Sequence, residues 1–466
     1  MAKVSPMEIY RLLPGTNCKE CGDVTCMAFA SSLIERNKKI GDCAPLFEDK
    51  FKENLKKLLE MMTPPVKEVT FGTGEKACSI GGEEVMFRHE LTFFNQAAFI
   101  IDIHDEMTDE EIAERVNRIN HFSVERIGQE LRLQGIAIRS KSDDPTKFGN
   151  TVISVIEKTD MPLVICSLRP ELLEVALEIA LEKSPLIYAA TEDNLGKIGE
   201  LALKYKCPVV ASSPGDIQGL IDITTNLMER GVEDIVLDIG TYTLGEKFGE
   251  MLDNLVSVRR LAIEEKVKEL GFPILGVPLV AWLAEKDPIL GGVYEATLAA
   301  TQTLRYCDAL IIHSLEMWEI LPLLTLRQNV YTDPRVPIMV DPGLYEIGSP
   351  DKNSPMMMTT NFALTYYTVA SDLEASKISC YLLVVDTDGL AVEPAMAGAK
   401  LTAGLVKETL DSAGANGKIK NKSLIIPGMV ARISGELEEE TGWEVVVGPI
   451  DSSRIKGFLD SKSKKN

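Results

Sequence analysis

The chain has 466 residues, of which 45% are hydrophobic and 26% are charged, which is ordinary for a soluble globular protein of two or three domains. It carries 49 Lys and Arg residues against 70 Asp and Glu residues, so its formal net charge is −21. A charge of this sign repels phosphate groups, which argues against nucleic acid or an anionic membrane surface as a partner.

The sequence also argues against secretion and membrane insertion. No apolar run approaches the length of a bilayer-spanning helix, and the first residues lack the apolar segment of a signal peptide. Nine cysteines are too few for a disulfide scaffold and fit a reducing compartment. We therefore expect a cytoplasmic protein.

Four cysteines near the N-terminus follow the spacing C-x2-C-x4-C-x16-C: Cys18, Cys21, Cys26 and Cys43. Three thiols fall close together, and the fourth returns after a predicted helix at 25–37. This distribution is typical of a chain that wraps a cubane 4Fe–4S cluster. Zinc and ordinary buried thiols are the alternatives. Structural zinc, however, is usually held by two short cysteine pairs, whereas the spacing here is three plus one. We expect residues 1–62 to form a small domain that the cluster stabilises.

Residues 63–334 are predicted to form a hairpin followed by a barrel. The hairpin strands are predicted at 66–71 and 84–93. Short apolar runs then alternate with amphipathic helices, the first of which is predicted at 109–133. The predicted barrel strands are 98–103, 135–139, 162–167, 186–190, 208–212, 234–239, 274–279 and 309–313. Eight such units favour a TIM (β/α)8 barrel over an open, doubly wound sheet.

Polar side chains lie at or just beyond the predicted ends of these strands, on the face where TIM barrels place their active sites. They are Asp102, His104, Ser167, Thr191, Ser212, Asp238 and His313. A pterin or sugar-phosphate site is one interpretation. The other, which we favour, is that these groups satisfy loop backbone and solvent, because the face has no paired carboxylates, phosphate loop or metal triad.

Residues 335–466 are predicted to form a small α/β domain with a parallel sheet. The predicted strands are 336–340, 380–385, 423–426 and 444–447, and the first predicted helix is 356–370. Ligands of such sheets bind beyond the carboxyl ends of the strands, here the loops at 341–343, 386–390 and 427–429. None of these loops is a G-x-G-x-x-G fingerprint, so a dinucleotide site is weakly supported.

This third segment contains no histidine. The four histidines of the chain are His89, His104, His121 and His313. A cobalamin bound by residues 335–466 would therefore receive no imidazole ligand from them.

Several segments, in this order, resemble the large subunit of the corrinoid/iron–sulfur protein of the acetyl-CoA synthase/decarbonylase (CO dehydrogenase) pathway. The matching segments are 13–18, 26–30, 359–367, 386–392, 427–431, 434–436 and 441–443. The likeness covers essentially the whole chain. It implies an α/β protein with an N-terminal 4Fe–4S domain, a TIM barrel and a C-terminal Rossmann-like domain that binds a corrinoid.

The resemblance implies a methyltransferase subunit that acts as a methyl carrier. In that family the corrinoid cobalt, cycling between cob(I) and methyl-cob(III), moves a methyl group between a methyl-tetrahydropterin or methyltetrahydrofolate and the nickel–iron–sulfur cluster of acetyl-CoA synthase. The 4Fe–4S cluster reactivates cob(II), and the corrinoid is held base-off without a protein histidine. Matching segments place the corrinoid contacts at Thr359, Thr365, Gly389, Leu390, Ala391, Val392, Gly428 and Ala431, and the cluster ligands at Cys18, Cys21, Cys26 and Cys43.

The resemblance also implies partners. They are a small corrinoid/iron–sulfur protein subunit that completes a heterodimer, acetyl-CoA synthase/CO dehydrogenase, a pterin or folate methyl-donor system, and a reductive activator or ferredoxin. Alternatives remain: an iron–sulfur electron-transfer subunit of a redox complex, a self-contained barrel methyltransferase acting on a pterin, or a non-catalytic assembly subunit.

Overall fold

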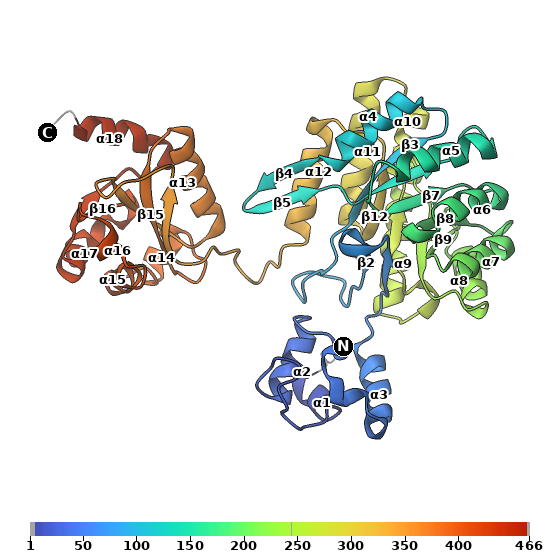
Figure 1. The fold of residues 1–466 in the computed structure, drawn as a ribbon, viewed down its shortest axis with the longest axis horizontal. Coiled ribbons are helices and arrows are strands. Elements are labelled where there is room, and N and C mark those ends of the chain that lie inside the picture. Colours follow the sequence, from blue (N-terminus) through green and yellow to red (C-terminus); the bar gives the residue numbers. More distant parts are fainter. Residues whose placement is uncertain (1–4, 244, 464–466) are drawn as a thin grey trace.

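The computed structural model describes residues 5–243 and 245–463. Figure 1 shows a small helical unit at the N-terminal end, a central barrel and an α/β unit at the C-terminal end. Each of these has its own cluster of buried apolar side chains. Across the described residues, no helix combines the length and the apolar character needed to cross a bilayer.

The N-terminal unit is built from three helices around a small core. They are α1 (Pro6–Tyr10), α2 (Cys26–Ile34) and α3 (Lys52–Met62). Thr25 caps α2, and its hydroxyl accepts a hydrogen bond from the backbone N–H of Ala28. The core is formed mainly by Ile9, Phe29, Leu33, Leu46 and Leu58, all almost fully buried. So few buried side chains leave the unit short of hydrophobic stabilisation.

An antiparallel hairpin closes the amino-terminal end of the barrel. Its strands are β1 (Glu68–Phe71) and β2 (Cys78–Gly81); the predicted second strand at 84–93 is wrong, because no strand forms there. Val69, Phe71 and Ile80 are buried among the inward-facing side chains of the barrel strands. Gly81 lies against Pro273, which directly precedes a barrel strand, so the hairpin sits where the strands begin.

The closed barrel of eight parallel strands confirms the prediction from the apolar runs. Around the barrel the order is β3, β6, β7, β8, β9, β10, β11 and β12, which is also their order in the chain. The bounds are β3 (Ala98–His104), β6 (Gly135–Arg139), β7 (Leu163–Cys166), β8 (Leu186–Ala190), β9 (Val209–Ser212), β10 (Ile235–Asp238), β11 (Ile274–Gly276) and β12 (Cys307–Ile312).

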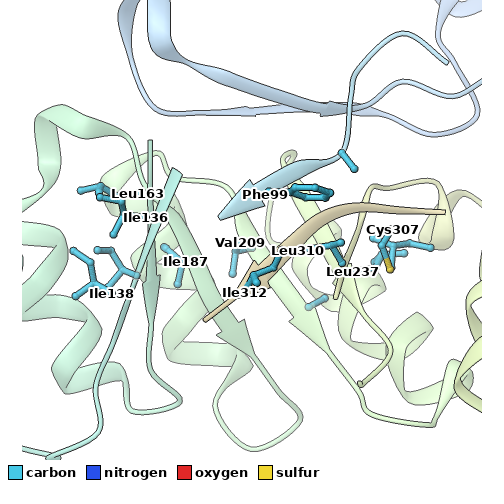
Figure 2. Packing of buried hydrophobic residues seen from close by; sticks show 14 of the residues in the cluster. Phe99, Ile136, Ile138, Leu163, Ile187, Val209, Leu237, Cys307, Leu310 and Ile312 are labelled. Carbon is cyan, nitrogen blue, oxygen red and sulfur yellow. The ribbon is translucent and has the colours of Figure 1, made fainter. Parts of the chain in front are cut away.

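Alternate side chains of the barrel strands enter two different cores. In β3, Ala98 and Ile100 face the barrel interior with the hairpin, whereas Phe99 and Ile101 pack outward against the helices. Figure 2 shows outward-packing residues from several strands, among them Ile136, Val209 and Leu310. Because both faces of each strand are buried, the strands appear in the sequence as continuous apolar runs.

Helices follow the barrel strands along the chain. They are α4 (Asp109–Asn120), α5 (Pro145–Ile156), α6 (Pro170–Ile179), α7 (Leu195–Tyr205), α8 (Ile217–Glu229), α9 (Glu246–Ile263), α10 (Ala281–Ala284), α11 (Pro288–Leu304) and α12 (Met317–Val330). The predicted helix at 109–133 is wrong in its second half. There the chain forms a hairpin of β4 (Ser123–Arg126) and β5 (Gln129–Arg132), whose tip at Gly128 lies against Tyr367 of the C-terminal unit.

The C-terminal unit is a five-stranded sheet in the order β13-β15-β14-β16-β17. Its strands are β13 (Gly343–Ile347), β14 (Met356–Thr360), β15 (Cys380–Val385), β16 (Ser423–Ile426) and β17 (Glu444–Val447). Only β13, at one edge, is antiparallel to its neighbour. Two predictions fail here: residues 356–360 form a strand rather than the start of a helix, and residues 336–340 form only one bridge, between Met339 and Phe362.

Helices cover both faces of this sheet. They are α13 (Ala363–Ala375), α14 (Val392–Ala397), α15 (Ala403–Ser412), α16 (Ala415–Lys418), α17 (Ser434–Thr441) and α18 (Ile455–Ser463). Side chains of α13 and α18 share one buried cluster with the sheet, and those of α14 to α17 share the other. The parallel strands lie in the order second, first, third and fourth, so the strand order reverses between β14 and β16. Open α/β sheets bind ligands at this switch point.

Candidate functional site

The four cysteines predicted to bind the cluster converge in the N-terminal unit. Cys18, Cys21, Cys26 and Cys43 all line one small cavity, together with Phe29. Cys18 is exposed, whereas Cys26 and Cys43 are buried. The loop that brings them together has left-handed backbone at Gly22 (φ +87°), where a side chain would be strained.

Local structure fixes the position of Cys26. Cys26 is the first residue of α2, and the side-chain oxygen of Asn17 accepts a hydrogen bond of 2.8 Å from its backbone N–H. Burial is the main cause that raises the pKa of the Cys43 thiol, and the charges of the Cys21, Cys26 and Cys18 sulfurs raise it further, against a hydrogen bond from the Leu46 backbone that lowers it. The sulfur of Cys43 therefore lies within electrostatic reach of the other three cysteines.

Arg36, two residues beyond the end of α2, anchors this unit to the segment that joins the hairpin to the first barrel strand. Its guanidinium donates to the carbonyl oxygen of Gly82 at 2.7 Å and to Glu84 Oε1 at 2.8 Å. The same group lies 4.1 Å from the centre of the Phe94 ring. Since α2 begins at Cys26, this arginine and a predicted cluster ligand lie at opposite ends of one short helix.

We expect Arg36→Ala to loosen the N-terminal unit from the rest of the chain while leaving the cysteine cavity intact. The substitution removes the hydrogen bonds and the ring contact but touches no cysteine. Limited proteolysis should cut the connection at residues 63–67 several-fold faster than in the wild type. Arg11→Ala, at an exposed arginine of the same unit, is the matched control. Equal cleavage rates for all three proteins would contradict an anchoring role.

The C-terminal unit contains a cavity of about 250 Å³ at the switch point between β14 and β16. One wall comes from these strands, through Met357, Met358, Thr359, Ile425 and Ile426. Helix α13 and the segment after β17 form the other wall. Its remaining lining residues are Leu364, Thr365, Thr368, Val369, Val392, Pro427, Pro449, Ile450, Ser452 and Ile455. The cavity is thus placed where the strand order predicts a ligand.

The predicted corrinoid contacts divide into two groups. Thr359, Thr365 and Val392 line this cavity, whereas the others lie outside its wall. Those outside are Gly389, Leu390, Ala391, Gly428 and Ala431. Gly389 packs closely against the segment before β13. A Cβ added at Gly389 would stand 2.6 Å from side-chain atoms of Pro337 and Met339.

Asn361, which sequence reasoning did not single out, organises the loop after β15. Its side-chain oxygen accepts hydrogen bonds from the N–H groups of Thr387 (2.9 Å) and Gly389 (3.1 Å) and from the Thr387 hydroxyl. Its amide nitrogen donates to Asp386 at 2.9 Å. One buried side chain from the end of β14 therefore fixes the whole turn, in which Asp388 and Gly389 are both left-handed.

Two threonine hydroxyls beside this loop are buried without partners. Thr359 and Thr360 are each at most 2% exposed, and within the described residues neither hydroxyl oxygen has a hydrogen-bond partner. An unpaired buried hydroxyl is costly in a folded protein. Because Thr359 also lines the cavity, its hydroxyl is positioned to bind a ligand there.

At the carboxyl end of the barrel, most of the polar strand-end residues form hydrogen bonds with other residues of the chain. Asp238 accepts hydrogen bonds from the hydroxyls of Tyr188 (2.7 Å) and Ser212 (2.9 Å), and from the N–H of Gly240. Ser167 accepts from the N–H of Arg169, and the side chain of Asn194 accepts from the N–H of Thr191. The contacts to the N–H groups of Gly240 and Arg169 fit the interpretation that these polar side chains pair with loop backbone.

Asp102 and His313 are brought together, which the sequence did not predict. Buried Asp102 accepts from His313 Nδ1 at 2.7 Å and pairs with Arg139 (2.6 Å) and Arg115 (3.1 Å). Burial by itself would raise the pKa of Asp102, but the hydrogen bond from His313 and the positive charges around it outweigh burial and hold that pKa well below its usual value. The ionised carboxylate thus ties β3, β6, α4 and the end of β12 together.

We expect Asp102→Asn to destabilise the barrel by roughly 3–5 kcal/mol at neutral pH, because it removes the buried carboxylate that pairs with two partly buried arginines. A depressed carboxyl pKa contributes stability that is complete above the unfolded value of about 3.9 and is lost as the pH falls towards the folded value. Chemical denaturation should therefore show the gap between wild type and variant narrowing below about pH 4. Asp143→Asn, at an exposed ion pair, should cost under about 1 kcal/mol. A gap that stays constant down to pH 3 would contradict this account.

Comparison with solved structures finds dihydropteroate synthases. The enzyme from Thermus thermophilus is 14% identical, with a TM-score of 0.36, and the match covers 56% of this chain and 97% of that one. The enzyme from Xanthomonas albilineans is 16% identical, with a TM-score of 0.39, over 51% of this chain and 94% of that one. The barrel described above rests on its own strand order and not on this likeness.

Two family models match the sequence. The model described as "CO dehydrogenase/acetyl-CoA synthase delta subunit" matches residues 68–459, and the one described as "Putative Fe-S cluster" matches residues 13–45. The second match contains all four cysteines of the N-terminal cavity.

Relatives extend over nearly the whole chain. The acetyl-CoA decarbonylase/synthase complex subunit gamma of Methanothermobacter thermautotrophicus is 45% identical over 98% of this chain and 99% of its own length. Subunit gamma 1 of Methanosarcina thermophila is 46% identical over 98% of each chain. The family model over residues 68–459 matches a subunit of the same kind of complex. By its identity to these relatives, the chain belongs to the family of acetyl-CoA decarbonylase/synthase complex gamma subunits.

Proposed function

We propose that this protein is the methyl-carrier subunit of its complex, equivalent to the large subunit of the corrinoid/iron–sulfur protein. The observation that supports this most is the pairing of two features in one chain. Four cysteines converge in the N-terminal unit, and a cavity with an unpartnered buried hydroxyl lies at the switch point of the C-terminal unit. The relatives are named as subunits of the acetyl-CoA decarbonylase/synthase complex, which is consistent with such a carrier.

The cysteine geometry fits a cluster better than a single zinc ion. Among the described residues, no three His, Cys, Asp or Glu side chains are grouped so that they could hold one metal ion. All four cysteines nevertheless line one cavity. Thiolates on separate irons of a cubane stand farther apart than thiolates on one ion, and thiolate is the ligand that iron–sulfur clusters use. Cys18, Cys21, Cys26 and Cys43 are therefore the proposed ligands of a 4Fe–4S cluster.

The C-terminal cavity fits part of a corrinoid and not the whole of it. At about 250 Å³ it is smaller than the clefts of roughly 300–1,000 Å³ that enclose drug-sized ligands. The macrocycle would lie outside the cavity, where a second subunit could approach it. Thr359, Thr365 and Val392 are proposed to contact the group from inside the cavity. The contacts proposed outside it are Gly389, Leu390, Ala391, Gly428 and Ala431.

When bound, the corrinoid supplies the cobalt that accepts and donates the methyl group, and the cluster supplies the electron that restores an oxidised cobalt. The chain's own part is to hold both groups. Residues 335–466 contain no histidine, so this unit offers cobalt no imidazole, which fits a base-off corrinoid. Removing an axial donor is one of the ways in which a protein shifts a metal's reduction potential.

The proposed partners follow from this role. They are a small subunit that covers the corrinoid, acetyl-CoA synthase/CO dehydrogenase on one side of the transfer, and a pterin or folate methyl-donor system on the other. A ferredoxin or a reductive activator would feed the cluster. Figure 1 shows the N-terminal unit and the C-terminal unit apart. Delivery of an electron from one to the other would therefore require the two units to approach each other.

Metal analysis and a visible spectrum of the anaerobically purified protein test this function. The chain is produced with its partner subunit and a corrinoid supply. We expect cobalt and iron in the same chain, with corrinoid absorption bands above a broad iron–sulfur shoulder. Iron without cobalt would contradict the carrier function and favour an electron-transfer subunit instead.

A further inference from the structure

Asp23 is an acidic side chain in the wall of the cysteine cavity. It lies between Cys21 and Cys26 in the chain and lines the cavity together with them. Its Oδ2 atom is shielded from solvent and has no hydrogen-bond partner within the described residues. Buried carboxylate oxygens are normally paired with donors, so this atom is costly to the folded unit and needs an explanation.

A cluster in the cavity would not satisfy this oxygen. Iron and sulfide carry no N–H or O–H group, so nothing in the cluster can donate a hydrogen bond to Asp23. A cubane held by four thiolates also carries a net negative charge, which grows by one when an electron is added. A carboxylate in the wall therefore repels the bound group, and it repels the reduced form more strongly than the oxidised form.

A lysine lies against the same turn of the cysteine loop. The Nζ atom of Lys38 would stand 3.2 Å from a Cβ added at Gly22, the residue directly before Asp23. Lys38 is half-buried, and it is not among the residues that line the cavity. Opposite charges thus flank one turn, with the acid in the cavity wall and the base outside it.

We propose that Asp23 lowers the reduction potential of the cluster, because its negative charge in the cavity wall disfavours the added electron. This inference rests on the proposed function, in which the four cysteines hold a 4Fe–4S cluster. Net charge around a cluster is one of the properties that set its potential. A more strongly reducing cluster is a better electron donor to an oxidised cobalt, which gives the unpaired carboxylate a role.

Redox titration of the full chain with its partner subunit measures this effect, with the reduced cluster followed by electron paramagnetic resonance. Asp23→Asn keeps the size of the side chain and removes its charge. We expect reduction of the cluster to become about tenfold more favourable, which is a shift of about 59 mV to higher potential for one electron. Asp23→Glu, which keeps the charge, should stay near the wild type. An unchanged potential in Asp23→Asn would overturn the inference.

Glu20→Gln is the matched control for position. Glu20 is an exposed acid of the same loop and is not among the residues that line the cavity, so removing its charge should shift the potential far less. At about 1 M salt, where the Debye length is about 3 Å, the shift in Glu20→Gln should vanish and the shift in Asp23→Asn should persist, since a shielded charge is screened less. Equal shifts in the two variants would overturn the inference, because a place in the cavity wall would then not matter.

Lys38→Met tests the sign of the effect. Removing a positive charge disfavours the reduced cluster, so we expect a shift to lower potential, opposite to the shift in Asp23→Asn. Lys56→Met, at an exposed lysine on α3, should leave the potential near that of the wild type. Shifts of the same sign in Lys38→Met and Asp23→Asn would overturn the inference, because both would then reflect a distorted loop and not a charge.

Iron content separates an effect on the potential from an effect on cluster binding. Asp23 is not one of the proposed ligands, so Asp23→Asn should keep the iron content of the wild type. Loss of iron from this variant, with iron retained in Glu20→Gln, would overturn the inference, because Asp23 would then be needed to hold the cluster.

Cobalt analysis of the same samples separates this inference from the proposed function. A chain without cobalt whose cluster responds to Asp23→Asn as expected would support the inference and contradict the carrier function. A chain with cobalt whose cluster potential does not change in Asp23→Asn would leave the carrier function standing and overturn the inference. A chain that binds no cluster would contradict both.

Discussion

Replacing Cys21 with alanine should abolish cluster binding while leaving corrinoid binding in place. Three thiolates cannot ligate all four corners of a cubane, and the unit around them has only a small apolar core. We expect the variant to lose most of its iron and the N-terminal unit to lose its protection from proteolysis. The barrel and the C-terminal unit have separate cores, so cobalt content should remain near that of the wild type.

The functional consequence is equally specific. With cobalt reduced chemically in advance, the Cys21→Ala variant should still transfer methyl groups, but it should not recover after oxidation to cob(II). Cys207→Ala, at a buried barrel cysteine outside the cluster loop, is the control. It should keep its iron and regain methyl transfer after oxidation. If methyl transfer from pre-reduced cobalt also fails in a folded Cys21→Ala protein, the cluster is more than an electron donor.

Asn361→Ala should have the largest effect in the C-terminal unit. The substitution removes the acceptor for the N–H groups of Thr387 and Gly389 and the donor to Asp386. Each buried group left unpaired costs about 1–3 kcal/mol, so we expect a loss of at least about 2 kcal/mol in unfolding free energy. Corrinoid retention should fall with it, because the loop at 386–390 carries proposed contacts.

Denaturant unfolding followed by tryptophan fluorescence, to which the buried Trp443 contributes the signal of the C-terminal unit, measures the loss of stability. Cobalt analysis after gel filtration measures corrinoid retention. Asn353→Ala, in the exposed loop before β14, is the matched control and should change neither. Normal corrinoid retention in a stable Asn361→Ala protein would show that the loop does not need this geometry to bind the group.

The barrel and the cysteine loop could be predicted from the sequence because their signals are local. Each barrel strand is buried on both faces and therefore appears as an apolar run. The cysteine spacing is a local pattern, because thiolates that converge on one cluster must lie close together. The pairing of Asp102 with His313 could not be predicted in this way. It depends on closure of the barrel, which sets the last strand beside the first.

The C-terminal unit was harder to predict because propensity and burial disagree there. Methionine favours helices, so residues 356–360 resemble the start of a helix, yet all five are buried as the strand β14 in the middle of the sheet. Pro337 lacks an N–H, which helps explain why the segment at 336–340 joins the sheet region by a single bridge. Asn361 had no visible signal, because its partners lie on a loop some 25 residues away.

The most direct test of the carrier account follows the methyl group itself. The reduced holoprotein is mixed with a radiolabelled methyl-tetrahydropterin or methyltetrahydrofolate and its methyltransferase, without acetyl-CoA synthase, and is then separated by gel filtration in the dark. The account predicts that label stays with the chain in proportion to cobalt and is released by visible light, as carbon–cobalt bonds are. A protein that contains reduced cobalt and retains no label, or retains label that light does not release, would contradict it.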